Sequence, residues 1–355
     1  MPRRLTVLLV AYPFAPVGPD AVGGAEQVVS ALDRGLVAAG DRSIVVACEG
    51  SEAAGELVAI PWRDGAPIDA EARTRAHREV RDAVWRTVAC EPVDVVHLHG
   101  LDADAYLPPP GPPTLVTLHL PPDWHAPGLL RPSRPNTWLN GVSRSQDLAL
   151  RQIADPGAMV CPVANGVAVD AFGAARHARR SFTLTLGRIC PEKGQHLAIE
   201  AARMASVPLL LAGKAYDYPE HQAYFRSQIA PRLDRSHRFL GPASFARKRR
   251  LLAAARCLLV PSLAAETSSL VAMEASACGT PVIAFGAGAL PEVVEHGVTG
   301  FLVRDVAEMA AAIGHAGEID PETCRRVARE RFAEARMLSS YLRLYDRLAL
   351  AAAPA

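Results

Sequence analysis

Short apolar runs alternate along this chain with longer segments in which apolar residues recur every three or four positions. The short runs are typical of buried strands, and the longer segments are typical of helices with one apolar face. This alternation predicts parallel sheets whose strands are linked by helical crossovers. The expected strands are residues 5–10, 43–47, 57–60, 93–97, 114–118 and 138–142, then 182–186, 208–211, 238–240, 257–260, 281–284 and 301–303. An apolar run at residues 159–163 is expected to close the first half.

The expected helices are residues 25–39, 69–89, 144–153 and 337–353. Between the two sets of strands, the polar and basic stretch ANGVAVDAFGAARHARRS has the character of a linker. The predicted organisation is a first domain at residues 1–164, a linker at 165–181, a second domain at 182–336 and a long amphipathic helix within 337–355. We expect an α/β protein with two doubly wound, Rossmann-like domains. Ligands of open α/β sheets bind at the carboxyl ends of the strands, so a cleft between the two domains is the expected site.

Composition narrows the class of partner. The 355 residues suit two domains, and half of them are hydrophobic, which is ample for two cores. A net charge of +1 argues against nucleic acid or an anionic membrane as the main partner. No apolar segment reaches the ~20 residues that span a bilayer, and the apolar N-terminal run is interpreted as a first strand rather than a signal peptide. Seven scattered cysteines without a C-x-x-C motif indicate reduced thiols in a cytoplasmic protein.

Two glutamates in the segment ETSSLVAME, Glu266 and Glu274, are the most informative residues. If this segment is one continuous helix, their side chains lie about 80° apart around the axis and roughly 12 Å apart along it. That separation is too large for the two carboxylates to share a proton. It suits a ligand as long as a nucleotide sugar, with one carboxylate at each end.

Two further motifs carry groups that suit phosphate. In GRICPEKG, Gly187 and Arg188 follow a predicted strand, and Lys193 lies where the next helix opens. A guanidinium and an ammonium at a helix start suit a diphosphate. In VGGAEQVV, Gly23 and Gly24 separate the first strand from its helix and allow backbone N–H groups to approach an anion or a sugar.

Taken together, the string PSLAAETSSLVAMEASACGTPVIAF and the motif GRICPEKG closely resemble the signature of retaining glycosyltransferases of family 4, which have the GT-B fold. The resemblance implies that Arg188 and Lys193 neutralise the pyrophosphate leaving group. It implies that Glu266 contacts the hydroxyls of the donor sugar and that Glu274 holds the ribose hydroxyls. It also implies that the C-terminal helix crosses back to the first domain.

The resemblance extends to the first domain. It implies that the loop with Gly23 and Gly24 faces the acceptor and the donor phosphates, and that His119, at a strand end, reaches a far hydroxyl of the donor sugar. The family's His-Asp pair is here His-Leu, so an Asp-linked role is missing, and Asp123 is a candidate substitute.

The sequence departs from the family pattern after the first glutamate, where Thr267, Ser268 and Ser269 stand in place of glycine-rich residues. Backbone N–H groups at the helix start, through Leu270, are still expected to hold the β-phosphate, and the hydroxyls add donors. His97 and His99 in VVHLHG have two readings, as packing residues or as part of the acceptor pocket. His-x-His alone does not make a metal site, and the family needs no metal, so the expected metal ligands are none and the expected cofactor is none.

The resemblance implies a retaining glycosyltransferase that moves a sugar from a nucleoside-diphosphate sugar to a soluble small-molecule acceptor. UDP is the default nucleotide, and GDP stays open, as does a homodimer. The leaving phosphate would accept the proton of the acceptor in a front-face attack. Two alternatives remain: a nucleotide-sugar 2-epimerase on a similar fold, and a non-catalytic nucleotide-binding homologue. An NAD enzyme is disfavoured, because no G-x-G-x-x-G follows the first strand.

Overall fold

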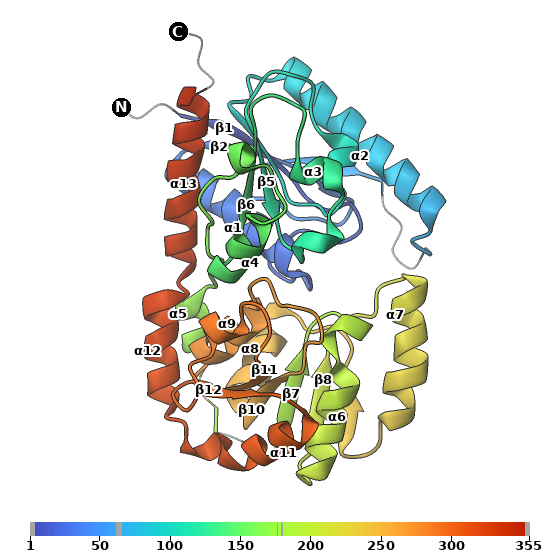
Figure 1. The fold of residues 1–355 in the computed structure, drawn as a ribbon, viewed down its shortest axis with the longest axis vertical. Helices are drawn as coiled ribbons and strands as arrows, with labels where there is room; N and C mark the ends of the chain where they lie inside the picture. Colours follow the sequence, from blue (N-terminus) through green and yellow to red (C-terminus); the bar gives the residue numbers. More distant parts are fainter. Residues whose placement is uncertain (1–3, 62–65, 176, 179, 352–355) are drawn as a thin grey trace. The chain divides into compact units, whose positions relative to one another are not determined.

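The computed structural model describes residues 4–61, 66–175, 177–178 and 180–351. The chain divides into two compact units, one formed by Met1–Ala164 with Ala335–Ala355 and the other by Asn165–Glu334 (Figure 1). Each unit contains a six-stranded sheet in which every strand pair is parallel. The predicted α/β class with two doubly wound sheets is confirmed.

The sheet of the first unit has the strand order β3-β2-β1-β4-β5-β6. Its strands are β1 (Thr6–Val10), β2 (Arg42–Cys48), β3 (Glu56–Ile60), β4 (Val95–Leu98), β5 (Thr114–Leu118) and β6 (Thr137–Gly141). Its helices are α1 (Gly24–Ala39), α2 (Ala70–Cys90), α3 (Pro127–Leu130), α4 (Arg144–Leu150) and, from Ala335 onward, α13 (Glu334–Ala351). Strands β1, β2, β4 and β5 are buried over nearly their whole length, as expected where helices cover both faces of a parallel sheet.

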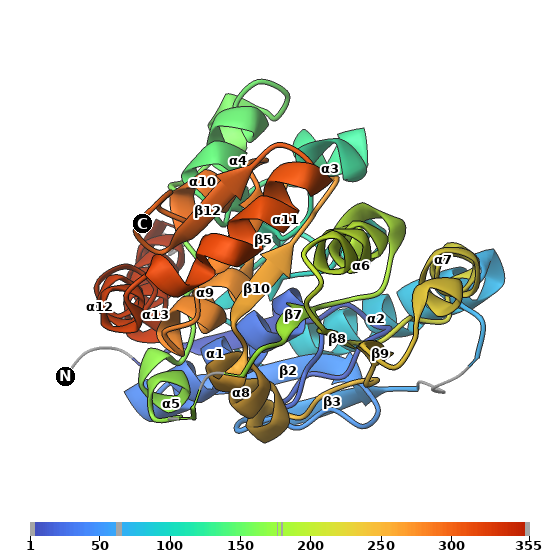
Figure 2. The ribbon, with the colours of Figure 1, turned by 90° about the horizontal axis from the view of Figure 1, so that it is seen from below.

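The sheet of the second unit has the order β12-β11-β10-β7-β8-β9. Its strands are β7 (Thr183–Leu186), β8 (Leu209–Ala212), β9 (His237–Phe239), β10 (Cys257–Val260), β11 (Val282–Phe285) and β12 (Gly300–Val303). Its helices are α5 (Val169–Gly173), α6 (Gln195–Met204), α7 (Pro219–Tyr224), α8 (Phe245–Ala254), α9 (Leu270–Ala277), α10 (Leu290–Val293), α11 (Val306–His315) and α12 (Pro321–Arg331). Figure 2 shows α6 and α11 on one face of this sheet and α8 and α9 on the other.

Both sheets follow one topology, since the first strand of each unit lies beside the fourth. In the first unit β1 pairs with β4, and in the second β7 pairs with β10. The direction of the chain across the sheet reverses between these two strands. Ligands of doubly wound sheets bind at the carboxyl ends of such a strand pair. The fold therefore predicts ligand binding at the loops that follow β1 and β4 in the first unit, and at the loops that follow β7 and β10 in the second.

Helix α13 is anchored in the first unit through two buried tyrosines. The hydroxyl of Tyr345 lies 2.7 Å from Nδ1 of His97, whose Nε2 lies 2.6 Å from Oγ1 of Thr117. The hydroxyl of Tyr341 lies 3.2 Å from the same threonine oxygen. Residues at opposite ends of the sequence thus share one buried polar network. This network supports a packing role for His97 rather than a role in the acceptor pocket.

Two predicted elements differ in the structure. Residues 159–163 form no strand, and Met159 makes only an isolated bridge with Leu139 of β6. Val160 and Val163 still donate to carbonyls of β6, but Pro162 between them has no N–H to donate, which explains why no regular ladder forms. The helix predicted at residues 144–153 ends at Leu150 and continues as turns.

Candidate active site

In the second unit, the predicted cations and the first glutamate come from the two loops that follow β7 and β10. Gly187 and Arg188 directly follow β7, and Lys193 ends a short 3-10 turn at Pro191–Lys193. The β10 loop contributes Ser262 and Glu266. Because β7 and β10 are neighbours in the sheet, sequence positions more than seventy residues apart meet at one edge.

The two loops are held together by backbone contacts. The amide of Leu263 donates to the carbonyl of Glu192 over 2.8 Å. Gly194 has a φ of +62°, and a Cβ there would lie 2.3 Å from the carbonyl oxygen of Pro261. Only glycine permits both this conformation and this approach. The loops are therefore fixed before any side-chain contact is considered.

An ion pair then joins the loops. Nζ of Lys193 lies 2.6 Å from Oε1 of Glu266, and the hydroxyl of Ser262 donates to the same oxygen. The Glu266 side chain is only 8% exposed, and that of Lys193 is 31% exposed. Burial alone would raise the pKa of Glu266, but Lys193, Ser262 and Arg188 together hold that pKa below its ordinary value. Glu266 is thus a buried carboxylate that stays ionised.

The helical spacing predicted for the two glutamates is wrong. Helix α9 begins at Leu270, so Glu266 lies in the loop before it and only Glu274 is helical. The carbonyl of Glu266 instead accepts the amide of Ala289 over 2.7 Å, which ties its backbone to the loop after β11. The separation of 80° and 12 Å, which assumed one continuous helix, does not apply.

The departure from the family pattern has a structural counterpart at the start of α9. Ser269, the N-cap residue, has a left-handed φ of +64°, a conformation that residues other than glycine adopt at a cost. The hydroxyls of Ser268 and Ser269 are buried and have no hydrogen-bond partner among the described residues. Two unsatisfied hydroxyls therefore lie at the amino end of a helix, where backbone N–H groups favour anions.

Glu274 is held by a partner that the sequence did not reveal. Its Oε1 lies 2.5 Å from Nζ of Lys248 on α8, and the two side chains are 3% and 15% exposed. Here burial outweighs the lysine and raises the pKa of Glu274. In sequence Lys248 is one of four consecutive cations in RKRR, so nothing distinguished it from a solvated basic run.

In the first unit, His119 follows β5 and makes a histidine pair. Nε2 of His119 lies 2.9 Å from Nδ1 of His99, which follows β4. Burial lowers the pKa of His119 to about 3, and burial also lowers that of His99 well below its ordinary value. Both imidazoles are therefore neutral near pH 7. The sequence offers Asp123 as a candidate partner of His119. In the structure, His99 is a partner of His119.

Gly23 and Gly24 belong to the start of α1 in the first unit, as N-cap and first helical residue. A Cβ on Gly23 would lie 1.8 Å from Oε2 of Glu26, so this glycine lets the buried Glu26 carboxylate fold back over the helix start. The predicted site residues thus fall into two sets. Arg188, Lys193, Glu266 and Glu274 with its helix belong to the second unit, and Gly23, Gly24 and His119 to the first.

Comparisons with known proteins identify the family of this chain. The model described as Glycosyltransferase Family 4 matches residues 22–153, and the model described as Glycosyl transferases group 1 matches residues 180–317. The chain belongs to glycosyltransferase family 4. The motifs GRICPEKG and ETSSLVAME both lie inside the second match.

Curated relatives include D-inositol 3-phosphate glycosyltransferases. The enzyme of Mycobacterium sp. strain KMS is 34% identical over 212 residues, which are 55% of this chain and 47% of the relative. The enzyme of Mycobacterium tuberculosis strain H37Ra is 37% identical over 177 residues, 46% of this chain and 36% of the relative. The chain therefore matches about half the length, or less, of these relatives.

Solved structures share the fold over nearly the whole chain. AviGT4, a glycosyltransferase involved in avilamycin A biosynthesis, is 25% identical with a TM-score of 0.70, covering 98% of both chains. Sucrose-phosphate synthase from Thermosynechococcus elongatus is 21% identical with a TM-score of 0.80, covering 98% of this chain and 100% of its own. HepE of Anabaena, solved with UDP and glucose, is 18% identical with a TM-score of 0.71, covering 97% and 100%. The fold is GT-B. Among the described residues, no helix is long and apolar enough to cross a membrane.

The Lys248–Glu274 pair gives a prediction for stability. In Lys248→Met the buried Glu274 carboxylate loses its partner, which costs about 3–5 kcal/mol when it is ionised. The pKa of Glu274 is raised in the folded protein, so the protonated form favours the folded state. Its contribution to the free energy of unfolding is lost as pH rises through the folded-state pKa. We expect the variant to lose stability between pH 5 and pH 8 more steeply than the parent, as measured by urea unfolding. The double variant Lys248→Met/Glu274→Gln should lose no more unfolding free energy with rising pH than the parent. An equal pH dependence in the parent and in Lys248→Met would contradict this account.

Proposed function

We propose that this chain is a retaining glycosyltransferase that moves a sugar from a nucleoside-diphosphate sugar to a soluble small-molecule acceptor. The observation that carries the proposal is the site at the edge of the second sheet. There Lys193 pairs with the buried, ionised carboxylate of Glu266, and the Arg188 guanidinium also acts on this carboxylate, in a chain of family 4. UDP is the nucleotide that we favour, and GDP is the second choice. The reaction as proposed draws on no metal ion.

The diphosphate is assigned to the cationic side of this site. Arg188 and Lys193 supply positive charge, and the amino end of α9 supplies backbone N–H groups. The unsatisfied hydroxyls of Ser268 and Ser269 add two donors that a phosphate oxygen would satisfy. Groups fixed before the reaction and aimed at charge that develops on a leaving group are the most effective electrostatic catalysts. Departure of the nucleoside diphosphate is therefore the step that these residues promote.

The two glutamates are assigned to hydroxyl groups at the two ends of the donor. Glu266 stays ionised, so it accepts hydrogen bonds from hydroxyls of the transferred sugar. Glu274 shares one oxygen with Lys248, and its other oxygen is assigned to the ribose diol. Thr267 and Leu270 flank the intervening serines and complete the donor-binding segment.

The first unit is assigned to the acceptor and to part of the donor sugar. His119 is neutral, so it can donate or accept a hydrogen bond to a sugar hydroxyl without carrying charge. Gly23 and Gly24 themselves place no side chain at the start of α1, so their backbone N–H groups are assigned to the ligand. In the transfer, the bond from the anomeric carbon to the phosphate oxygen breaks and a bond to the acceptor oxygen forms on the same face. The acceptor proton passes to the leaving phosphate.

The relatives support the choice of substrates. HepE is described in complex with UDP-glucose, which favours a UDP donor. The curated relatives are named for transfer to an inositol phosphate, and AviGT4 for the biosynthesis of avilamycin A, which favours a small acceptor. Seven free cysteines favour a reducing compartment such as the cytoplasm.

A thermal-shift panel of UDP, GDP, ADP, TDP and NAD tests the proposal. A ligand that binds only the folded protein raises its melting temperature by mass action. We expect one nucleoside diphosphate, UDP first, to raise the melting temperature, and Arg188→Ala to abolish the shift. The matched control is Arg250→Ala, which removes an exposed cation of α8 and should keep the shift. A shift with NAD alone, or with none of the five, would overturn the proposed function.

Turnover of the matching sugar nucleotide tests the individual residues. Arg188→Ala, Lys193→Ala and Glu274→Ala should each lower turnover by about 10²–10³-fold, the usual cost of losing one preorganised group. Release of the nucleoside diphosphate with a panel of polyol and glycoside acceptors measures turnover, and proton NMR of the product gives the anomer. Full activity in any variant removes that residue from the site, and an inverted anomer contradicts retention.

A further inference from the structure

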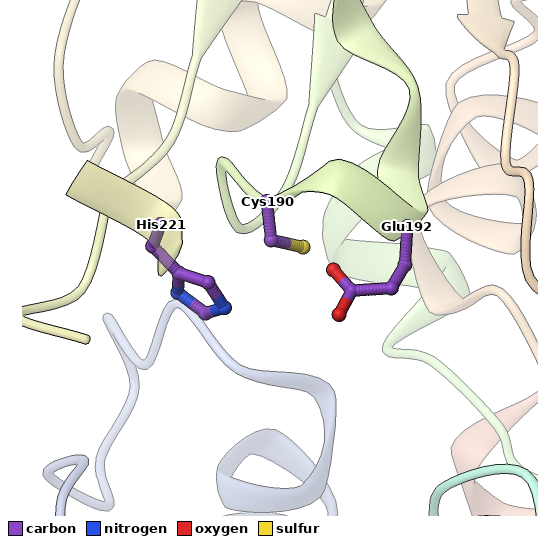
Figure 3. A group of neighbouring side chains, drawn as sticks. All are labelled: Cys190, Glu192 and His221. Atoms are coloured by element: carbon purple, nitrogen blue, oxygen red, sulfur yellow. The ribbon is translucent and has the colours of Figure 1, made fainter. Parts of the chain in front are cut away.

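Cys190, Glu192 and His221 form a cluster of metal-ligating side chains in the second unit. One donor atom from each residue lies within 4.8 Å of the other two. Cys190 and Glu192 come from the loop after β7, and His221 comes from the first turn of α7. Figure 3 shows the three side chains pointing toward a common space. Thiol, carboxylate and imidazole are the ligands that zinc takes in proteins.

The cluster has an unsatisfied group. Oε2 of Glu192 is buried and has no hydrogen-bond partner among the described residues. A buried acceptor without a partner costs about 1–3 kcal/mol. Cys190 is 1% exposed and His221 is 8% exposed, so the other two donors are also largely shielded from water. A bound cation would satisfy the orphaned oxygen.

We infer that Cys190, Glu192 and His221 bind one Zn²⁺ ion, with three protein ligands and one open position. Soft thiolate and imidazole donors select zinc over magnesium or calcium, which take oxygen ligands. Zinc bonds of about 2.0–2.3 Å in a tetrahedron place ligand atoms about 3.4–3.6 Å apart. The donor atoms therefore move closer to one another by at most about 1.2–1.4 Å when the ion binds. The inference does not rest on the proposed transfer reaction.

The charges of the cluster suit a dication. Burial, with Arg188 nearby, lowers the pKa of His221, so its imidazole is neutral and ready to bind. Burial tends to raise the pKa of Glu192, but its own backbone N–H and the Cys190 thiol hold it below its ordinary value. Burial raises the pKa of Cys190 to about 11, so zinc must displace the thiol proton, which leaves to solvent. Zinc, one thiolate and one carboxylate then sum to zero charge.

The neutral sum explains how the site can coexist with neighbouring cations. Arg188 precedes Cys190 by two residues, and Lys193 follows Glu192 directly. A bare dication would be repelled by both, whereas a charge-neutral zinc site is not. Glu220, at the start of α7, adds a negative charge that acts on His221. The same loop thus carries the proposed diphosphate cations and the zinc ligands.

Zinc binding to the full chain tests this inference. The parent for the test is Cys90→Ser/Cys161→Ser, because these two exposed cysteines could bind zinc independently. After chelator treatment and dialysis in a phosphine reductant, Zn²⁺ is titrated against a chromophoric chelator. We expect one ion per chain. Cys190→Ser and His221→Phe should each weaken zinc affinity by at least about tenfold, the smallest loss usual even for a residue that only supports a metal ligand.

Two readouts separate a zinc site from a merely structural cluster. Co²⁺ in place of zinc should give a thiolate-to-cobalt charge-transfer band that Cys190→Ser abolishes. Glu192→Gln should weaken zinc binding, whereas the matched control Glu220→Gln, on a neighbouring exposed carboxylate, should weaken it much less. Circular dichroism shows whether each variant folds. Failure of the parent to retain zinc, or unchanged affinity in folded Glu192→Gln and His221→Phe, overturns the inference whatever the nucleotide assays show.

Discussion

The ion pair between Lys193 and Glu266 is the interaction on which the candidate site depends. It joins the loops that follow β7 and β10, the two strands at which the chain reverses direction across the second sheet. The fold brings these loops together, and the contact of Gly194 with Pro261 fixes their approach. Without Lys193, the largely buried carboxylate would have to be protonated or lose its position. The backbone contacts therefore set the approach of the loops, and the ion pair sets the position and charge of the Glu266 carboxylate between them.

The two glutamates differ because their surroundings differ. Glu266 has a lysine, a serine hydroxyl and a nearby arginine, and its pKa is lowered. Glu274 has a single lysine and deeper burial, and its pKa is raised. A carboxylate that stays ionised suits sugar hydroxyls beside a reacting carbon. A carboxylate locked to a lysine suits a fixed contact with a nucleoside. The roles proposed for the two glutamates are supported by these environments and not by spacing along a helix.

Much of the fold could be predicted from the sequence, because parallel strands buried on both faces leave an unmistakable apolar pattern. The predicted run 114–118 coincides with β5 and 257–260 with β10, and most other strands shift by one or two residues. The failures have local causes. Pro162 interrupts pairing beside β6, and the left-handed Ser269 delays the start of α9 past Glu266. The hydrophobic pattern could not reveal either cause, because neither the missing N–H of Pro162 nor the left-handed conformation of Ser269 changes that pattern.

The candidate site could be predicted only where it follows contiguous motifs. Arg188, Lys193 and both glutamates lie in such motifs. Other partners do not: Lys248, which pairs with Glu274, lies in a basic run, and His99 contacts His119 only because β4 and β5 are neighbours. The Cys190, Glu192 and His221 cluster also joins two segments without any motif spacing. Contacts of this kind depend on strand order and loop conformation, which a single sequence does not display.

Isothermal titration of the nucleoside diphosphate into Lys193→Ala, Glu266→Gln and the double variant tests the central claim most directly. If Lys193 holds the diphosphate and Glu266 holds the sugar, Lys193→Ala should weaken binding by about tenfold or more. Glu266→Gln, which removes a negative charge beside the phosphates, should bind the diphosphate at least as tightly while losing transfer of the sugar. Loss of diphosphate binding in Glu266→Gln, with binding kept in Lys193→Ala, would show that the roles of the two residues are reversed and would contradict this account.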